Sequence, residues 1–301
     1  MPRTLLTVHA HPDDESSKGA GTLARYADEG VRTVVVTCTG GEAGDILNPA
    51  MDQPGNLERM PELRRRELAR ALEILNVREH YFLGYRDSGM PDTDTNGHPD
   101  AFVQADLDEA VGRLVGIIRR ERPQVLVTYD ESGGYPHPDH IRTHEISVAA
   151  FDAAGDAGRY PEAGPPFQPL QLYYHASPSR QRIELLHKAA LERGIETPYG
   201  EWLEHWDDEI GPDHREPPIT TRVDVARWRP QARAALIAHE TQIDPNGSWF
   251  TIPEELHTEI YPWDDYSLAR SLVPTSDSED DLFAALDAEG APLPASGIQH
   301  R

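Results

Sequence analysis

Short runs of aliphatic and β-branched residues alternate with segments of helical period through the first half of the chain. Strands are predicted over residues 5–8, 33–37, 81–83 and 125–128, and helices over residues 19–28, 61–75, 107–120 and 139–154. This alternation is typical of a parallel sheet wrapped by helices. The sequence therefore predicts an α/β fold with a Rossmann-like, doubly wound, mostly parallel sheet flanked by helices.

The pattern is less regular after residue 160. Strands are predicted over residues 170–174 and 219–223, and helices over residues 181–193 and 229–241. We expect a single domain over 1–273, with a core in 1–160 and a C-terminal extension in 161–273 that closes over the site. Residues 274–301 begin with an acidic stretch and end in a run rich in Pro and Gly, which predicts a flexible tail.

Two segments that combine His and Asp each follow a predicted strand. The first is His11-Pro12-Asp13-Asp14-Glu15, and the second is Tyr135-Pro136-His137-Pro138-Asp139-His140. In the common doubly wound order, the first and fourth strands are neighbours at the switch point, where a crevice opens at the carboxyl edge of the sheet. Long polar loops over residues 40–60 and 84–102 leave strands at the same edge. We therefore expect the two segments to meet in space.

Composition limits the kind of metal site and the kind of partner. The single cysteine, Cys38, excludes an internal disulfide and Cys-rich zinc sites, so any metal must be held by His and carboxylates. The net charge of −24 would repel nucleic acid and anionic lipid. No apolar run is long enough to cross a bilayer, and the N-terminus lacks the pattern of a signal peptide. We expect a cytoplasmic protein with a small-molecule substrate and no nucleic acid or membrane partner.

The two segments offer more ligands than a hydrolytic zinc site needs. Such a site takes three His or carboxylate ligands and keeps a fourth position for water. Residues three apart at the start of a helix share a face, which pairs His11 with Asp14 and His137 with His140. Asp13, left beside a ligand, can take a proton from water that zinc has activated. The sequence therefore predicts a zinc site with an adjacent carboxylate base.

The alternative is that each His-Pro-Asp motif only marks the start of a helix, with Asp as the N-cap and Pro restricting the backbone. One such segment alone would leave the two interpretations even. Two copies, each placed after a buried strand, favour a site. His9 and His144 are weaker candidates, because they fit a buried strand residue and a helix surface residue.

Together the two segments resemble those of the LmbE-like zinc deacetylases, a family that includes glucosaminyl-phosphatidylinositol deacetylases and the actinobacterial enzymes of mycothiol metabolism. The resemblance extends through residues 44–51 and 129–142, and through Thr39-Gly40-Gly41-Glu42, Asp87-Ser88-Gly89, Trp202-Leu203-Glu204-His205-Trp206 and Asp280-Asp281-Leu282-Phe283. It therefore spans nearly the whole chain. It implies hydrolysis of an amide, for which the protein supplies activated water, a polarised carbonyl and a proton for the departing amine.

The resemblance implies that His11, Asp14 and His140 are the zinc ligands and that Asp13 is the general base and later the acid. Ferrous iron also suits two His and one carboxylate. It further implies roles for the remaining residues of the second segment. His137 would be a charged partner that steadies the oxyanion, Asp139 would hold His137, and Tyr135 would reach the oxyanion or the leaving group.

The resemblance also implies a set of substrate contacts. Arg64, Asp45 and Asp87 match positions that hold glucosamine and inositol hydroxyls in the relative that deacetylates the mycothiol precursor. The alternative for Arg64 is an exposed helix residue in the run Arg64-Arg65-Arg66. Lys18 is typical of the amidase branch of the family, which acts on mycothiol S-conjugates; its alternative is a solvated helix surface lysine.

The expected reaction is cleavage of the amide between glucosamine and N-acetylcysteine in mycothiol S-conjugates, which releases a mercapturic acid. The alternatives are the N-acetylglucosaminyl-inositol deacetylase of mycothiol biosynthesis and a related amidase of antibiotic biosynthesis. A metal-dependent sugar-binding protein without catalysis is disfavoured, because it would not need Asp13. A dinucleotide enzyme is disfavoured because no Gly-x-Gly-x-x-Gly follows the first strand.

Overall fold

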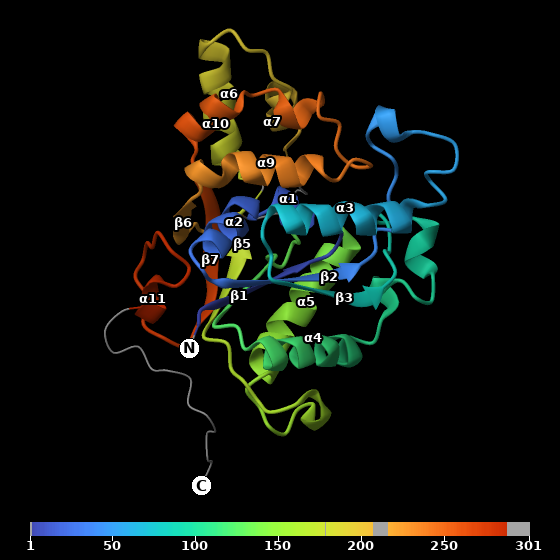
Figure 1. Cartoon of the computed structure of the whole chain (residues 1–301), viewed down its shortest axis with the longest axis vertical. Helices are drawn as coiled ribbons and strands as arrows, with labels where there is room; N and C mark the ends of the chain where they lie inside the picture. The colour runs from blue at the N-terminus through green and yellow to red at the C-terminus, as the bar shows by residue number, and fades with distance from the viewer. Residues whose placement is uncertain (1, 178, 207–215, 288–301) are drawn as a thin grey trace.

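The computed structural model describes residues 2–177, 179–206 and 216–287, which include a seven-stranded sheet of order β3-β2-β1-β4-β5-β7-β6 (Figure 1). The five parallel strands are β1 (Thr4–His9), β2 (Arg32–Thr39), β3 (Glu79–Tyr85), β4 (Val125–Thr128) and β5 (Gln171–His175). β7 (Trp263–Ser271) runs antiparallel to β5 and to β6 (Thr221–Asp224). The predicted α/β class and the mostly parallel, doubly wound sheet are confirmed.

Helices cover both faces of this sheet. One face packs on α2 (Ala20–Asp28), α3 (Met60–Ile74) and α9 (Arg229–Ile237), and the other on α4 (Leu107–Glu121) and α5 (Pro138–Ala153) (Figure 1). Every residue of β1 and β4 is buried. Strands that are covered on both faces require continuous apolar runs, which is why these two segments were readable from the sequence.

The first and fourth strands are neighbours, as predicted. Leu5 of β1 pairs with Val125 of β4, and Thr7 pairs with Val127. Because both strands point the same way, the chain leaves both at one edge of the sheet. The short helix α1 (Asp14–Ser17) follows β1, and α5 begins ten residues after β4 ends. The two His-containing segments therefore lie side by side at the switch point.

The C-terminal half adds a second layer beyond α9. The helices α6 (Arg180–Glu192), α7 (Tyr199–Glu204) and α10 (Glu254–Ile260) lie there (Figure 1), around a small core that includes Leu186, Leu256 and Tyr261. The sequence did not predict α7, α10 or β7. In β7, the polar Asp264, Asp265 and Arg270 interrupt the apolar pattern, although the strand lies inside the sheet between β5 and β6.

The chain after residue 274 differs from the prediction of a loose tail. Leu282 and Phe283 are fully buried in the core, and the backbone N–H of Leu282 donates to the Tyr26 hydroxyl at 2.8 Å. The short helix α11 (Ala284–Asp287) follows. The prediction of a flexible tail is therefore wrong as far as residue 287, because this apolar pair packs against α2. Residues 288–301 lie outside the described residues. Within the described ranges, no helix combines the length and apolar character needed to cross a membrane.

Candidate metal centre

Three side chains from the two segments converge at the carboxyl edge of the sheet. His11 follows β1, Asp14 opens α1, and His140 lies in the first turn of α5. Asp14 Oδ2 is 3.5 Å from His11 Nδ1 and 3.4 Å from His140 Nε2, and all three residues are buried. Two imidazole nitrogens and one carboxylate oxygen around a common point form a donor set suited to zinc.

The hydrogen bonds of His140 leave one ring nitrogen free for a metal. Its Nδ1 lies 3.0 Å from the carbonyl oxygen of Gly133, so Nδ1 carries the proton and donates. Its Nε2 is buried and has no hydrogen-bond partner in the described part of the chain. The Tyr129 ring stacks on the imidazole with centroids 4.4 Å apart and fixes its orientation. A buried, unpartnered ring nitrogen of a fixed tautomer fits a metal ligand.

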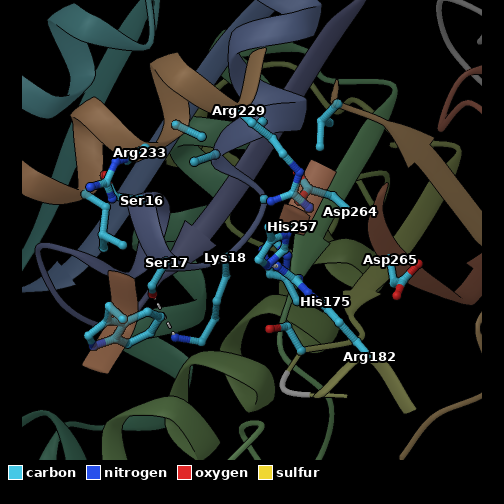
Figure 2. A pocket seen from close by; sticks show the side chains of 18 of the residues that line it. Ser16, Ser17, Lys18, His175, Arg182, Arg229, Arg233, His257, Asp264 and Asp265 are labelled. Carbon is cyan, nitrogen blue, oxygen red and sulfur yellow. Dashed lines mark hydrogen bonds between the residues drawn. The ribbon is translucent and has the colours of Figure 1, made fainter. Parts of the chain in front are cut away.

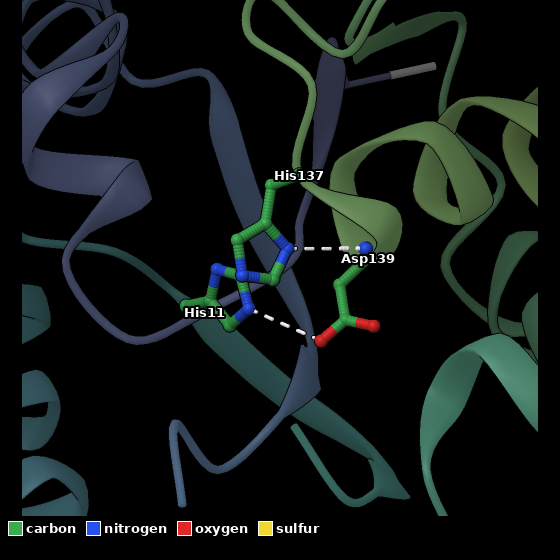
Figure 3. A group of neighbouring side chains, drawn as sticks. All are labelled: His11, His137 and Asp139. Atoms are coloured by element: carbon green, nitrogen blue, oxygen red, sulfur yellow. Dashed lines mark hydrogen bonds and ion pairs between the residues drawn. The ribbon is translucent and has the colours of Figure 1, made fainter. Parts of the chain in front are cut away.

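His11 is oriented in the complementary way. Its Nε2 lies 3.2 Å from Asp139 Oδ2 and 3.5 Å from Asp87 Oδ1, so Nε2 donates and Nδ1 is left available to bind a metal. Burial alone would lower the pKa of His11, but the neighbouring carboxylates, Asp87 above all, outweigh it and hold this pKa well above its usual value. Figure 3 shows the contact between His11 and Asp139.

Asp139 holds His11, which corrects the predicted pairing with His137. The Asp139 carboxylate accepts from the backbone N–H of Ser88 at 2.9 Å and from the Ser88 hydroxyl, as well as from His11. Only its backbone N–H reaches His137, donating to Nδ1 at 3.1 Å (Figure 3). A second possible metal group, His11 with His137 and Asp139, is the weaker one because both Asp139 oxygens are already used.

His137 is a neutral helix cap in this structure rather than a charged group. It is the N-cap residue of α5, and its Nδ1 accepts a hydrogen bond, which an imidazolium cannot do. Burial, followed by the neighbouring His11 and His140, lowers the pKa of His137 to about 3. The predicted charge on His137 is therefore wrong here, and its Nε2 carries the single ring proton.

Asp13 stands beside the ligand set in a strained backbone. Its φ of 113° is rare for a residue with a side chain, and such strain is concentrated at functional sites. The carboxylate makes no helix-capping bond and instead accepts from Arg64 Nη2 at 2.8 Å, which argues against simple helix-start chemistry. Burial raises the pKa of Asp13, opposed by Arg64 and assisted by Asp14. A raised pKa suits a group that takes and returns a proton.

Arg64 is buried, so the interpretation as an exposed helix residue is wrong. Its guanidinium donates to the carbonyl oxygens of Pro12 and Gly41 and to Asp13. Gly41 has φ +72°, and a Cβ there would lie 2.3 Å from Arg64 Nη1, so only glycine admits this guanidinium. Arg64 thereby links the Asp13 carboxylate to Gly41 in the loop after β2.

The other two predicted sugar contacts differ in position. Asp87 is buried at the site, where its carboxylate accepts from the backbone N–H groups of Gly89 and Ala43 and lies next to His11. Asp45 is exposed, and its backbone oxygen accepts from Gln242. The structure brings Asp87 to the metal group and leaves the Asp45 side chain on the surface of its loop.

Lys18 and Tyr135 border the metal group. Lys18 Nζ donates to Asp14 Oδ1 at 2.8 Å, and its side chain is only 11% exposed, so it is not a solvated surface lysine. Burial alone would raise the pKa of Asp14, but Lys18 and His140 outweigh it and keep this carboxyl ionised. The Tyr135 ring lies edge-on to His140, with centroids 4.6 Å apart.

One ion pair at the site was missed by the sequence analysis. Glu15 Oε1 lies 2.8 Å from His239 Nε2, and both residues are fully buried. Glu15 Oε2 accepts from the backbone N–H of Asp13 at 3.0 Å, so the pair helps to fix the strained backbone of Asp13. Glu15 belongs to the first segment, whereas His239, after α9, carries no local sequence signal.

The weaker histidine candidates lie outside the ligand set. His9 is a buried strand residue whose Nε2 contacts the Thr7 hydroxyl at 3.0 Å, as predicted. His144 lies one turn beyond His140 on α5, and its Nδ1 bonds the Tyr129 carbonyl oxygen at 2.9 Å.

Comparison with known proteins places this centre in a family. Residues 6–151 match the family model PIG-L, described as GlcNAc-PI de-N-acetylase. A mycothiol S-conjugate amidase of Streptomyces coelicolor is 50% identical over 287 residues, which cover 94% of this chain and 97% of the relative. The chain belongs to the PIG-L family. The predicted resemblance is confirmed, and the PIG-L chain is a hydrolase of amide bonds.

Other relatives of this PIG-L protein carry a different activity in their names. A 1D-myo-inositol 2-acetamido-2-deoxy-alpha-D-glucopyranoside deacetylase of Geodermatophilus obscurus is 42% identical over 296 residues, with 94% of this chain and 98% of the relative covered. Among solved structures, the N,N'-diacetylchitobiose deacetylase of Pyrococcus horikoshii superposes with a TM-score of 0.57 at 17% identity, over 88% of this chain and 83% of that one. That likeness shows a shared fold.

Proposed function

We propose that this PIG-L protein hydrolyses the amide between glucosamine and N-acetylcysteine in mycothiol S-conjugates, releasing a mercapturic acid and glucosaminyl-inositol. The observation that carries the proposal is the buried Lys18 beside Asp14, because an ammonium at this edge of the centre can donate to the carbonyl groups of a cysteinyl arm. The Streptomyces coelicolor relative named as this amidase supports it. Such a reaction would serve detoxification.

We propose zinc as the metal, held by His11, Asp14 and His140. When bound, zinc polarises the amide carbonyl and lowers the pKa of water to roughly 7. Ferrous iron fits the same donor set. The unpartnered His140 Nε2 and the ionised Asp14 support a resident divalent cation.

Asp13 is proposed to carry the proton through the reaction. It takes a proton from the attacking water as the carbon–oxygen bond forms, and it gives a proton to the glucosamine nitrogen as the carbon–nitrogen bond breaks. Arg64 and the Glu15–His239 pair hold Asp13 in place. With Nδ1 occupied by the Asp139 amide, His137 can donate from Nε2 to the oxyanion, and Tyr135 can reach the oxyanion or the leaving group.

The sugar and the acyl arm of the substrate are proposed to contact different residues around the centre. We propose that Arg64, Asp45 and Asp87 bind the sugar and inositol hydroxyls. Lys18 contacts Asp14 Oδ1, whereas the two imidazole rings lie next to Oδ2, and we propose that the acyl arm leaves the metal on the Lys18 side.

The test is a side-by-side assay of zinc-loaded protein on a mycothiol S-conjugate and on N-acetylglucosaminyl-inositol. We expect a higher kcat/KM for the conjugate. Preference for the acetylated precursor would make the biosynthetic deacetylase the better assignment. Weak turnover of both would favour a specialised amidase of antibiotic biosynthesis.

A further inference from the structure

A pocket opens beside Lys18, between the α1–α2 segment and the helices of the C-terminal half (Figure 2). We call it the arginine pocket; its polar lining includes Lys18, His175, Arg182, Arg229, Arg233 and His257. Figure 2 shows Arg182, Arg229, His175 and His257 gathered in one part of it.

Two of these arginines form no salt bridge in the described part of the chain. No carboxylate there lies within 4.0 Å of the Arg182 or Arg229 guanidinium, whereas Arg233 is paired with Glu254 at 3.7 Å. Arg229 donates to the Tyr261 carbonyl oxygen, and its Nε has no partner among these residues. Burial, followed by the neighbouring Arg182, lowers the pKa of Arg229 to about 10 against the opposing effect of Asp264, Glu254 and Asp224. Half-buried cations without a directly paired anion are costly, and a bound anion would relieve that cost.

The aspartates that line the pocket are hydrogen-bonded to other groups, and its two histidines carry no charge that would pair with the arginines. Asp264 accepts from the backbone N–H and the hydroxyl of Thr22, and Asp265 accepts from the Tyr261 hydroxyl. His257 Nε2 lies 3.2 Å from Arg182 Nη2 and acts as a neutral acceptor. His175 Nε2 is buried and unpartnered within the described ranges. The polar groups of the pocket are therefore arranged for a ligand that brings its own negative charge.

Lys18 connects this pocket to the metal centre. Asp14 contacts His140 through Oδ2 and Lys18 through Oδ1. Because Lys18 also lines the pocket, Asp14 and Lys18 link the two regions. Arg64 reaches the centre from α3 and contacts Asp13, and Asp87 reaches it from the loop after β3 and contacts His11. An amide whose carbonyl lies at the metal would send its sugar towards Arg64 and its acyl arm into the arginine pocket.

We infer that the arginine pocket receives the acyl arm of the substrate and that Arg182 and Arg229 select arms that carry a carboxylate. The inference rests on the proposed function. The chain's net charge of −24 repels anions over long range, so attraction must come from cations placed locally. Guanidinium groups recognise carboxylates through charge-assisted hydrogen bonds. Trp249 and Phe250, which also line the pocket, offer an apolar wall for the rest of the arm.

The experiment compares two conjugates of the same size on zinc-loaded, full-length protein: S-(4-carboxybenzyl)- and S-(4-carbamoylbenzyl)-mycothiol. A hydrogen bond to a charged group contributes enough for roughly a ten- to hundredfold higher kcat/KM on the carboxylate. Arg182→Met should remove this preference by lowering kcat/KM for the carboxylate conjugate much more than for the carbamoyl conjugate, whereas Arg182→Lys should keep part of the preference. Arg227→Met is the matched control, because Arg227 is 77% exposed and lies two residues before Arg229.

The outcomes separate this inference from the proposed function. Equal rates on the two conjugates would overturn the inference and leave the amidase proposal standing. A carboxylate preference that survives both in Arg182→Met and in Arg229→Met would also overturn it. Turnover of N-acetylglucosaminyl-inositol alone, with neither conjugate cleaved, would overturn both.

Discussion

The metal centre and the arginine pocket are adjacent, but they differ in whether their charged side chains have partners within the protein. In the metal centre each charged side chain meets a partner from the protein itself, in the contacts Asp14–Lys18, Asp13–Arg64, Glu15–His239 and His11–Asp139. In the arginine pocket, Arg182 and Arg229 face no carboxylate within salt-bridge distance among the described residues. The first arrangement is preorganised for chemistry, whereas the second leaves charge for a ligand to satisfy.

The two regions also come from different parts of the fold. The centre is built where the chain leaves β1 and β4, on parallel strands buried on both faces. The pocket needs α6, α9 and α10 from the C-terminal half, which pack as a second layer. Reaction chemistry and substrate choice can therefore change separately, and the following predictions test that separation.

The largest effect is expected at the ligand set. His140→Ala should lose both the metal and the activity, because the remaining His11 and Asp14 are too few to hold zinc. Metal analysis of the purified variant checks this. His144→Ala, one turn along the same helix, should keep both. Full metal content in His140→Ala would remove His140 from the ligand set and weaken the description of the centre.

Asp13→Ala should keep the zinc and lose most of the turnover. General acid–base groups contribute ~10²–10⁴-fold, so kcat should fall by that range while metal content stays unchanged. His137→Ala should behave in the same way. The exposed Asp52, changed to Ala, is the control. Activity of Asp13→Ala within a few-fold of the parent would contradict its assigned role.

The buried Glu15–His239 pair should matter for stability as well as position. His239→Ala leaves Glu15 buried without its partner, which should cost ~3–5 kcal/mol of unfolding free energy. Urea unfolding measures this loss of unfolding free energy, provided that the m-value of the variant equals that of the parent. His239→Gln keeps a donor towards Glu15 and should lose less. If both variants unfold like the parent, the pair is not what secures the backbone of Asp13.

Lys18 lies on the boundary between the two regions, so its effect should depend on the substrate. Lys18→Ala should lower kcat/KM for a mycothiol conjugate by roughly ten- to a hundredfold, because a hydrogen bond from the ammonium is lost. N-acetylglucosaminyl-inositol should be hydrolysed poorly and at nearly the same rate by both forms. Equal impairment on both substrates would assign Lys18 to the metal centre alone, through Asp14.

The smallest effect is expected at Asp45, which is exposed on its loop. Because water competes for the exposed carboxylate, a sugar hydroxyl bonded there should contribute no more than the ~0.5–1.5 kcal/mol of an ordinary hydrogen bond, so Asp45→Ala should raise KM only a few-fold and leave kcat unchanged. Initial-rate kinetics with the conjugate test this. An unchanged KM would remove Asp45 from the substrate contacts, while Asp87, buried beside His11, would keep its place.

Local pattern carried much of the prediction. The buried strands over 5–8 and 125–128 were readable because strands covered on both faces are continuously apolar, and their adjacency followed from the doubly wound order. The three-residue spacing that pairs His11 with Asp14 was also visible, and the structure brings these two side chains within 3.5 Å. The family resemblance added His140 as the third member of the group.

Only the tertiary structure decided which groups are partners. The sequence suggested that Asp139 holds His137, whereas the folded chain turns its carboxylate to His11 and Ser88. His239 lies 224 residues from Glu15, and Arg182 reaches the pocket from another helix than Arg229. Neighbours along the chain leave a periodic trace in the sequence, but contacts between distant segments leave none. The sequence by itself therefore determined the parallel core and the carboxylate and imidazole groups that meet at its edge, whereas their hydrogen-bond partners and the arginine pocket depend on how the two halves pack.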